Sequence, residues 1–192
     1  MSDSHSATRK KVVILGSTGS IGTSALKVAR EIPERMEVVG LAAGRRTEEL
    51  VAQAREFGVK HLAIADESLT DQLAESAPEG CVLHAGAEGL RELARLPEAD
   101  MVLIAIVGTE GLQPALDAIE AGKDLAVASK EILVMAGELV MKAAKEAGVK
   151  VLPARRRGAT AALRQSRRTV CMHHAHLMRI SCTSHAHLMH IS

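Results

Sequence analysis

A glycine-rich segment near the N-terminus has the residue types and spacing of a phosphate-binding turn. Gly16, Gly19 and Gly22 follow a short apolar run at residues 11–15 and precede apolar residues at helical spacing. Glycines at this spacing permit a tight turn and let the backbone approach a pyrophosphate, while the next helix offers free N–H groups. The turn also contains three hydroxyl side chains, Ser17, Thr18 and Ser20. The alternative is a plain strand–helix turn without a ligand, but the flanking strand and helix favour nucleotide binding.

A basic segment follows the second apolar run, residues 38–43. Domains specific for NAD usually have Asp or Glu here, which binds the 2′-hydroxyl of the ribose. This chain instead has Gly44, Arg45 and Arg46. Two guanidinium groups could hold a 2′-phosphate between them, which predicts a preference for NADPH. The alternative is that both arginines are ordinary solvated charges.

A third candidate segment, Ser129, Lys130 and Glu131, follows an apolar run at residues 124–128. Lys130 could bind an anion or an oxygen atom of a substrate, and Glu131 could accept a hydrogen bond. The alternative is a surface ion pair at the start of a helix.

Strands and helices are expected to alternate along the chain, with Thr47 capping one helix and residues 101–107 forming the central strand. The expected strands are residues 11–15, 38–43, 61–65, 81–84, 101–107, 124–128 and 150–152. The expected helices are residues 21–32, 47–57, 69–76, 88–95, 112–121 and 137–147. Such alternation predicts right-handed crossovers and a Rossmann-like, doubly wound α/β fold with a mostly parallel sheet. Ligands of such sheets bind beyond the carboxyl ends of the strands, where all three candidate segments fall.

The composition supports this fold class and excludes several functions. Hydrophobic residues make up 47% of the 192 residues but aromatic residues only 1%, so the core must be aliphatic, as in buried parallel sheets. Without aromatic stacking platforms, single-stranded nucleic acid is not an expected partner. The three cysteines have no disulfide or zinc-site spacing. With no secretory signal and no apolar run of membrane-spanning length, we expect a cytoplasmic protein without a membrane partner.

The charge balance changes after Pro153. Residues 154–192 contain seven Arg and no Asp or Glu, whereas the first 153 residues contain all 23 acidic residues and 17 Lys and Arg. We therefore predict a nucleotide-binding domain at residues 9–153 and an unstructured Arg/His-rich tail at residues 154–192. Its six histidines would bind metal only adventitiously, since no carboxylate accompanies them. They are His173, His174, His176, His185, His187 and His190. Salt-sensitive, nonspecific nucleic-acid binding by the seven Arg is an alternative function.

Several separated motifs resemble one enzyme family. Leu15-Gly-Ser-Thr-Gly-Ser-Ile-Gly22, Ala105-Ile-Val-Gly108, Gly111-Leu112 and Ala128-Ser-Lys-Glu-Ile-Leu-Val134 match signatures of 1-deoxy-D-xylulose 5-phosphate reductoisomerases, in order and at similar separations. The resemblance extends over residues 9–153. It implies an NADPH-dependent rearrangement and reduction of 1-deoxy-D-xylulose 5-phosphate to 2-C-methyl-D-erythritol 4-phosphate, in non-mevalonate isoprenoid biosynthesis. Another NADP-linked oxidoreductase, such as a homoserine or semialdehyde dehydrogenase, is not expected to have these motifs together.

The resemblance also implies roles for individual residues. Matching positions predict NADPH contacts from Gly16, Thr18, Gly19, Ser20, Ile21, Gly44, Arg45, Arg46, Ser129 and Glu131. Lys130 is expected to contact the substrate. Position 129 is usually Asn in the family, so the shorter Ser129 could weaken one hydrogen bond to the cofactor. The intact family is implied to be homodimeric, to act on a phosphorylated sugar and to use Mg²⁺ or Mn²⁺.

The resemblance ends at Pro153. The family continues with a Val-Asp-Ser-Glu-His segment that supplies metal ligands, whereas this chain continues with Ala154-Arg-Arg-Arg-Gly and has no later carboxylate. We therefore predict no catalytic and no metal-binding residue here, and expect the family's catalytic and C-terminal domains to be missing. A non-catalytic fragment that binds NADPH is the corresponding interpretation. The composition of residues 154–192 suggests translation in a wrong reading frame or a damaged gene, a hypothesis that sequencing the encoding DNA would test.

Overall fold

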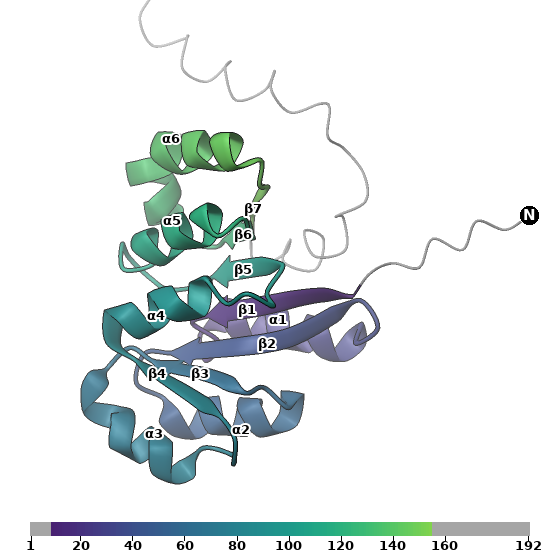
Figure 1. Cartoon of the computed structure of the whole chain (residues 1–192), viewed down its shortest axis with the longest axis vertical. Helices are drawn as coiled ribbons and strands as arrows, with labels where there is room; N and C mark the ends of the chain where they lie inside the picture. The colour runs from purple at the N-terminus through teal and green to yellow at the C-terminus, as the bar shows by residue number, and fades with distance from the viewer. Residues whose placement is uncertain (1–8, 155–192) are drawn as a thin grey trace, which may run out of the picture.

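A seven-stranded parallel sheet forms the centre of the computed structural model, which describes residues 9–154 (Figure 1). The strand order is β4-β3-β2-β1-β5-β6-β7, and all neighbouring strands are parallel. The strands are β1 (Lys10–Leu15), β2 (Met36–Ala43), β3 (His61–Ile64), β4 (Val82–Ala85), β5 (Met101–Ile104), β6 (Asp124–Val127) and β7 (Val151–Pro153). The order reverses between β1 and β5, and ligands of such sheets bind at this point.

Helices cover both faces of the sheet, as the doubly wound prediction requires. They are α1 (Ser20–Glu31), α2 (Thr47–Phe57), α3 (Thr70–Ser76), α4 (Gly86–Ala94), α5 (Leu112–Glu120) and α6 (Lys130–Ala147), with a short 3₁₀ turn η1 (Glu67–Leu69). Side chains of α1, α2 and α3 share one hydrophobic cluster, and those of α4, α5 and α6 share the other. Figure 1 shows α3 and α6 at opposite ends of the molecule.

The alternation of side chains along β1 explains why two clusters form. Val12 and Ile14 belong to the cluster under α1, whereas Val13 and Leu15 belong to the cluster under α4, and all four are fully buried. A strand buried on both faces has no polar side to display, so it has the continuous apolar sequence seen at residues 12–15. The predicted Rossmann-like fold with an aliphatic core is thus confirmed.

Four details of the predicted elements are wrong. The central strand is β1, and β5 ends at Ile104, three residues before the predicted end of that strand. Helix α6 begins at Lys130, seven residues before the predicted start, and contains a kink at Ala136, whose φ of −132° is not helical. Thr47 is the first residue of α2 and does not cap it, since Arg46 occupies the N-cap position.

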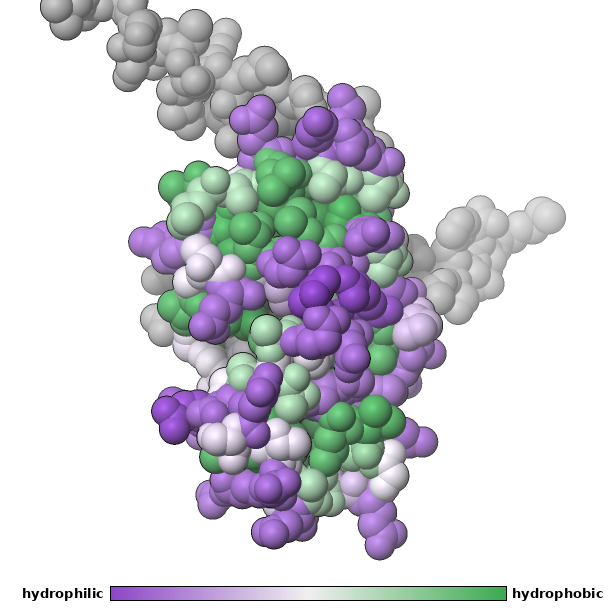
Figure 2. Space-filling view, turned by 60° about the vertical axis from the view of Figure 1, so that its left-hand side comes forward, coloured by the Kyte–Doolittle hydropathy of each residue, from purple (hydrophilic) through white to green (hydrophobic). Residues whose placement is uncertain are grey.

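The outer side of α6 is unusually apolar for a surface. Val134, Met135, Leu139 and Met141 are all more than half exposed. Figure 2 shows hydrophobic surface gathered over the upper end of the molecule, where α5 and α6 lie. The predicted tail, residues 154–192 with its six histidines, lies outside the described residues except for Ala154.

Candidate functional site: a pocket at the carboxyl edge of the sheet

A pocket of about 400 Å³ lies at the carboxyl ends of β1, β2, β3 and β5. It brings together the glycine-rich turn and the basic segment, which are far apart in the sequence. The predicted residues that line it are Gly16, Thr18, Gly19, Gly44, Arg45 and Arg46. It lies where the strand order reverses, as expected for a nucleotide site in this fold.

Close packing of the glycine-rich turn requires two of its glycines. Gly16 has a φ of +91°, and a Cβ atom there would lie 2.7 Å from the carbonyl oxygen of Ala105. A Cβ atom at Gly22 would lie 2.3 Å from the carbonyl oxygen of Gly16. The N–H groups of Gly16 and Ser17 both donate to the carbonyl of Ala42, which fixes the turn against β2. The glycine-rich turn is therefore closely packed and held against β2 at the rim of the pocket.

The N-terminus of α1 leaves backbone donors unused. Gly19 is the N-cap residue, no side chain caps the helix, and no acidic residue lies in its first turn. Within residues 9–154, the N–H groups of Ser20, Ile21 and Gly22 have no backbone acceptor. Ser20 and Ile21 do not line the pocket, so the structure places them beside it, at the helix end that attracts anions.

The basic segment is tied to the glycine-rich turn. Arg46 donates from Nη1 to the carbonyl oxygen of Thr18 at 3.2 Å, and it pairs with Glu49 at 3.3 Å. Arg45 pairs through Nε with Asp66 at 3.2 Å, yet its side chain is 79% exposed. Both arginines thus stand at the rim of the pocket, with most of their surface open to solvent or a ligand.

The third candidate segment lies apart from the pocket. Ser129, Lys130 and Glu131 form the N-cap and first turn of α6, and none of them lines the pocket. The hydroxyl of Ser129 is 3.1 Å from the carbonyl oxygen of Gly108 and 3.0 Å from the carboxylate of Glu131. Hydrogen bonds from its own backbone N–H and from Ser129 lower the pKa of Glu131. The link to Gly108 connects this segment to the loop that follows β5.

Sequence reasoning assigned no role to eight further lining residues. They are Ala42, Ala43, Ala65, Leu90, Ala105, Ile106, Val107 and Glu110. Most of these residues lie at or just after the carboxyl ends of β2, β3 and β5. Because ligands bind at such strand ends, the sequence could have suggested these residues. Leu90 lies on α4, and only the packing of that helix over the sheet brings it to the pocket.

Residues 9–154 contain neither a metal-binding group of side chains nor a membrane-spanning helix. In residues 9–154 no three His, Cys, Asp or Glu side chains come together in a group able to hold a metal ion. No helix in this range has the length and apolar character needed to cross a membrane.

The fold and pocket define a Rossmann-type domain with a site suited to a phosphorylated dinucleotide. Residues 12–137 match the family model described as 1-deoxy-D-xylulose 5-phosphate reductoisomerase. The chain belongs to this family.

Individual relatives agree with the family match. The chain is 46% identical over 144 residues to the 1-deoxy-D-xylulose 5-phosphate reductoisomerase of Thermodesulfovibrio yellowstonii, covering 75% of this chain and 38% of that protein. It is 49% identical over 150 residues to that of Symbiobacterium thermophilum, covering 76% and 39%. The chain thus spans less than two-fifths of the length of these relatives.

Solved structures agree as well. The enzyme from Zymomonas mobilis in complex with NADPH superposes with a TM-score of 0.72 and 39% identity, covering 76% of this chain and 38% of that one. A reductoisomerase in complex with NADPH, fosmidomycin and magnesium gives a TM-score of 0.71 at 39% identity, covering 75% and 36%.

Proposed function

We propose that the pocket binds NADPH, with the pyrophosphate at the N-terminus of α1 and the 2′-phosphate at Arg45 and Arg46. The observation that supports this most is the joint placement of the glycine-rich turn and the basic segment around one pocket. Backbone N–H groups and the helix dipole attract the pyrophosphate, while guanidinium groups match the geometry of a phosphate. Gly44 gives the ribose room, since nothing lies within 4 Å of where its Cβ atom would be.

We further propose that the chain is the NADPH-binding part of a 1-deoxy-D-xylulose 5-phosphate reductoisomerase. The whole enzyme would rearrange 1-deoxy-D-xylulose 5-phosphate and reduce the product to 2-C-methyl-D-erythritol 4-phosphate, with NADPH as the source of hydride. The solved relatives bind NADPH, magnesium and fosmidomycin, which supports a phosphorylated small molecule as substrate. In such an assembly Lys130 would contact the substrate, and Ser129 and Glu131 would complete the cofactor site.

The residues described here do not fit the divalent cation that the family implies. Residues 9–154 contain no suitable group of donors, and residues 155–192 contain no Asp or Glu. Since the cation stabilises charge that develops on the substrate oxygens, no chemical step is assigned to this chain. We therefore propose that the chain binds NADPH without turning over substrate.

Calorimetric titration of the full chain with NADPH and with NADH measures the two dissociation constants and tests the first proposal. NADPH is expected to bind at least about tenfold more tightly than NADH, because one extra charged phosphate meets two guanidinium groups. Equal or tighter binding of NADH would refute the role of Arg45 and Arg46. A turnover assay with 1-deoxy-D-xylulose 5-phosphate, NADPH and Mn²⁺ is expected to show no oxidation of NADPH, and measurable oxidation would refute the proposed inactivity.

A further inference from the structure

Asp66 lies beside the basic segment because the pairing of β2 with β3 continues past the strand ends. The N–H of Ala65 donates to the carbonyl of Ala43 at 2.9 Å, and the N–H of Asp66 donates to that of Gly44 at 3.1 Å. Ala65 lines the pocket and Asp66 follows it directly. These two hydrogen bonds hold the backbone of Asp66 in register with Arg45.

The carboxylate of Asp66 is itself held in place. Its Oδ1 atom accepts hydrogen bonds from the N–H of Ser68 at 3.1 Å and from the hydroxyl of Ser68 at 2.6 Å. The pKa of Asp66 is lowered most by the hydrogen bond from the Ser68 hydroxyl, less by that from the Ser68 N–H, and least by the charge of Arg45. The Asp66 carboxyl is therefore ionised at neutral pH. The second oxygen, Oδ2, is free of Ser68 and lies 3.2 Å from Nε of Arg45.

The guanidinium of Arg45 keeps its far side open. Its ion pair with Asp66 is made through Nε at 3.2 Å, and the side chain is otherwise 79% exposed. A guanidinium presents donors on two edges, so a partner at Nε leaves the two terminal amino groups for another anion. A long exposed side chain without such a partner would lose more conformational freedom on binding a ligand.

We propose that Asp66 is a positioning residue that increases the preference of the pocket for NADPH: it holds the Nε side of Arg45, so that the terminal amino groups face the 2′-phosphate. This inference rests on the proposed binding of NADPH at Arg45 and Arg46. A carboxylate near a phosphate also repels it, but both lie at an exposed rim where solvent and salt weaken that repulsion. The proposal therefore requires that the orientation of Arg45 contribute more to NADPH binding than this repulsion removes, which the variants below measure.

The experiment uses the full chain and compares dissociation constants for NADPH and NADH in Asp66→Asn. Asparagine has the same shape and can still accept both hydrogen bonds from Ser68, so η1 and the loop are preserved. The ratio of the two constants is expected to fall about threefold, the size of an exposed ion pair. Asp71→Asn, which removes an exposed charge on the first turn of α3, is the matched control and should leave the ratio unchanged.

A second variant, Ser68→Ala, separates orientation from charge. It removes the hydroxyl hydrogen bond to Oδ1 of Asp66, keeps the one from the backbone N–H of residue 68, and leaves the charges of Asp66 and Arg45 in place. A change in the ratio therefore does not come from the loss of a charge. We expect a decrease of about twofold, in the same direction as for Asp66→Asn, because orientation is only partly lost. In the Arg45→Ala background, Asp66→Asn should have no further effect on the ratio.

The outcomes distinguish this inference from the proposed function. If the unchanged chain does not prefer NADPH, the proposed function fails and this inference fails with it. If the unchanged chain prefers NADPH but Asp66→Asn keeps or increases the ratio, only the role of Asp66 is overturned. A decrease in Asp66→Asn that persists in the Arg45→Ala background also overturns it, since Asp66 would then act without Arg45.

Discussion

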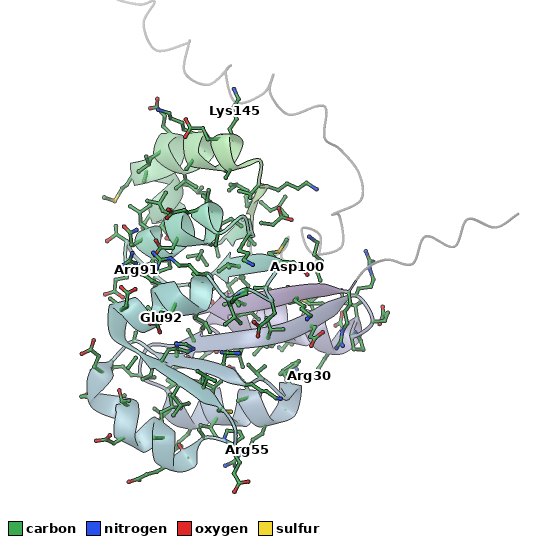
Figure 3. The ribbon with its side chains drawn as sticks, viewed as in Figure 1. Arg30, Arg55, Arg91, Glu92, Asp100 and Lys145 are labelled. Carbon is green, nitrogen blue, oxygen red and sulfur yellow. The ribbon has the colours of Figure 1, made fainter. Side chains whose placement is uncertain are left out.

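Two pairs of arginines in this chain have opposite surroundings. On α4, Arg91 and Arg95 both bind Asp117 of α5, at 2.6 and 2.7 Å, and the Asp117 side chain is only 2% exposed. Figure 3 shows Arg91 near the boundary between these two helices. At the pocket, Arg45 and Arg46 pair instead with Asp66 and Glu49, whose side chains are 28% and 52% exposed.

The difference shows which positive charges remain available to a ligand. A buried carboxylate that accepts hydrogen bonds from two arginines and from Gln113 has its own need for partners satisfied and holds one side of each arginine. The partners at the pocket leave most of each arginine side chain exposed, so an incoming phosphate can share the guanidinium groups. The first pair therefore stabilises the fold, and the second pair is suited to binding.

The largest expected effect follows from removing the buried carboxylate. Asp117→Ala removes the buried carboxylate that Arg91 and Arg95 share and leaves them the exposed Glu88 as a common partner. It should lower the free energy of unfolding by about 3 kcal/mol. Urea denaturation followed by circular dichroism measures this. Glu56→Ala, which removes the exposed partner of Arg30, is the control and should cost less than about 1 kcal/mol. Similar losses in the two variants would mean that the buried Asp117 stabilises the fold no more than an exposed ion pair does.

The second prediction concerns the pocket. Arg45→Ala combined with Arg46→Ala should weaken NADPH binding about 30-fold, because the 2′-phosphate loses its charged donors. NADH binding should change less than about threefold, and the free energy of unfolding by no more than about 0.5 kcal/mol, as for other exposed sites. Calorimetric titration and urea denaturation of the same preparation measure both. A loss of stability as large as that of Asp117→Ala would contradict the division between fold and binding.

The sequence predicted the pocket pair of arginines but not the buried pair. Arg45 and Arg46 follow an apolar run, so a general rule about strand ends places them at the ligand side of the sheet. Nothing near Arg91 and Arg95 in the sequence reveals their buried partner, because Asp117 lies 26 and 22 residues further along the chain. Only the packing of α5 against α4 brings the carboxylate between them.

The fold was predictable for a similar reason. Continuous aliphatic runs bounded by glycine identify the buried strands, and their alternation with helices fixes a parallel sheet. The start of α6 was predicted at residue 137 because Ser129, Lys130 and Glu131 were interpreted as a ligand segment, with the start of a helix only as the alternative. In the structure the helix begins at Lys130, and the predicted start lies next to the kink at Ala136. Because the exposed side of α6 is also apolar, the spacing of apolar residues did not identify residues 130–147 as one continuous helix.

Acid should weaken the buried ion pairs of Asp117. Burial alone would raise the pKa of Asp117, but hydrogen bonds from Arg91, Arg95 and Gln113 outweigh this and lower it. A carboxylate whose pKa is lower in the folded state adds stability above its unfolded pKa of about 3.9, and this is lost as pH falls through the folded value.

The stability difference between the unchanged chain and Asp117→Asn should therefore be constant from about pH 7 to pH 5 and shrink below about pH 4. Urea denaturation across this range measures it, and other carboxylates cancel because both proteins contain them. A difference that grows as pH falls would have the wrong sign and would show that Asp117 is not ionised in the folded protein.

The smallest expected effect is that of salt, which screens exposed charges more than buried ones. The Debye length falls from about 10 Å at 0.1 M to about 3 Å at 1 M NaCl, so the attraction of Arg45 and Arg46 for the 2′-phosphate should weaken. The preference for NADPH over NADH should fall about threefold over this range, whereas the stability difference between the unchanged chain and Asp117→Asn should barely change. General effects of salt cancel in both quantities, because one is a ratio of dissociation constants for two ligands and the other is a difference in unfolding free energy between two proteins. If the ratio were as insensitive to salt as the buried pair, the phosphate would have to contact Arg45 and Arg46 in a dry pocket, contrary to their high exposure.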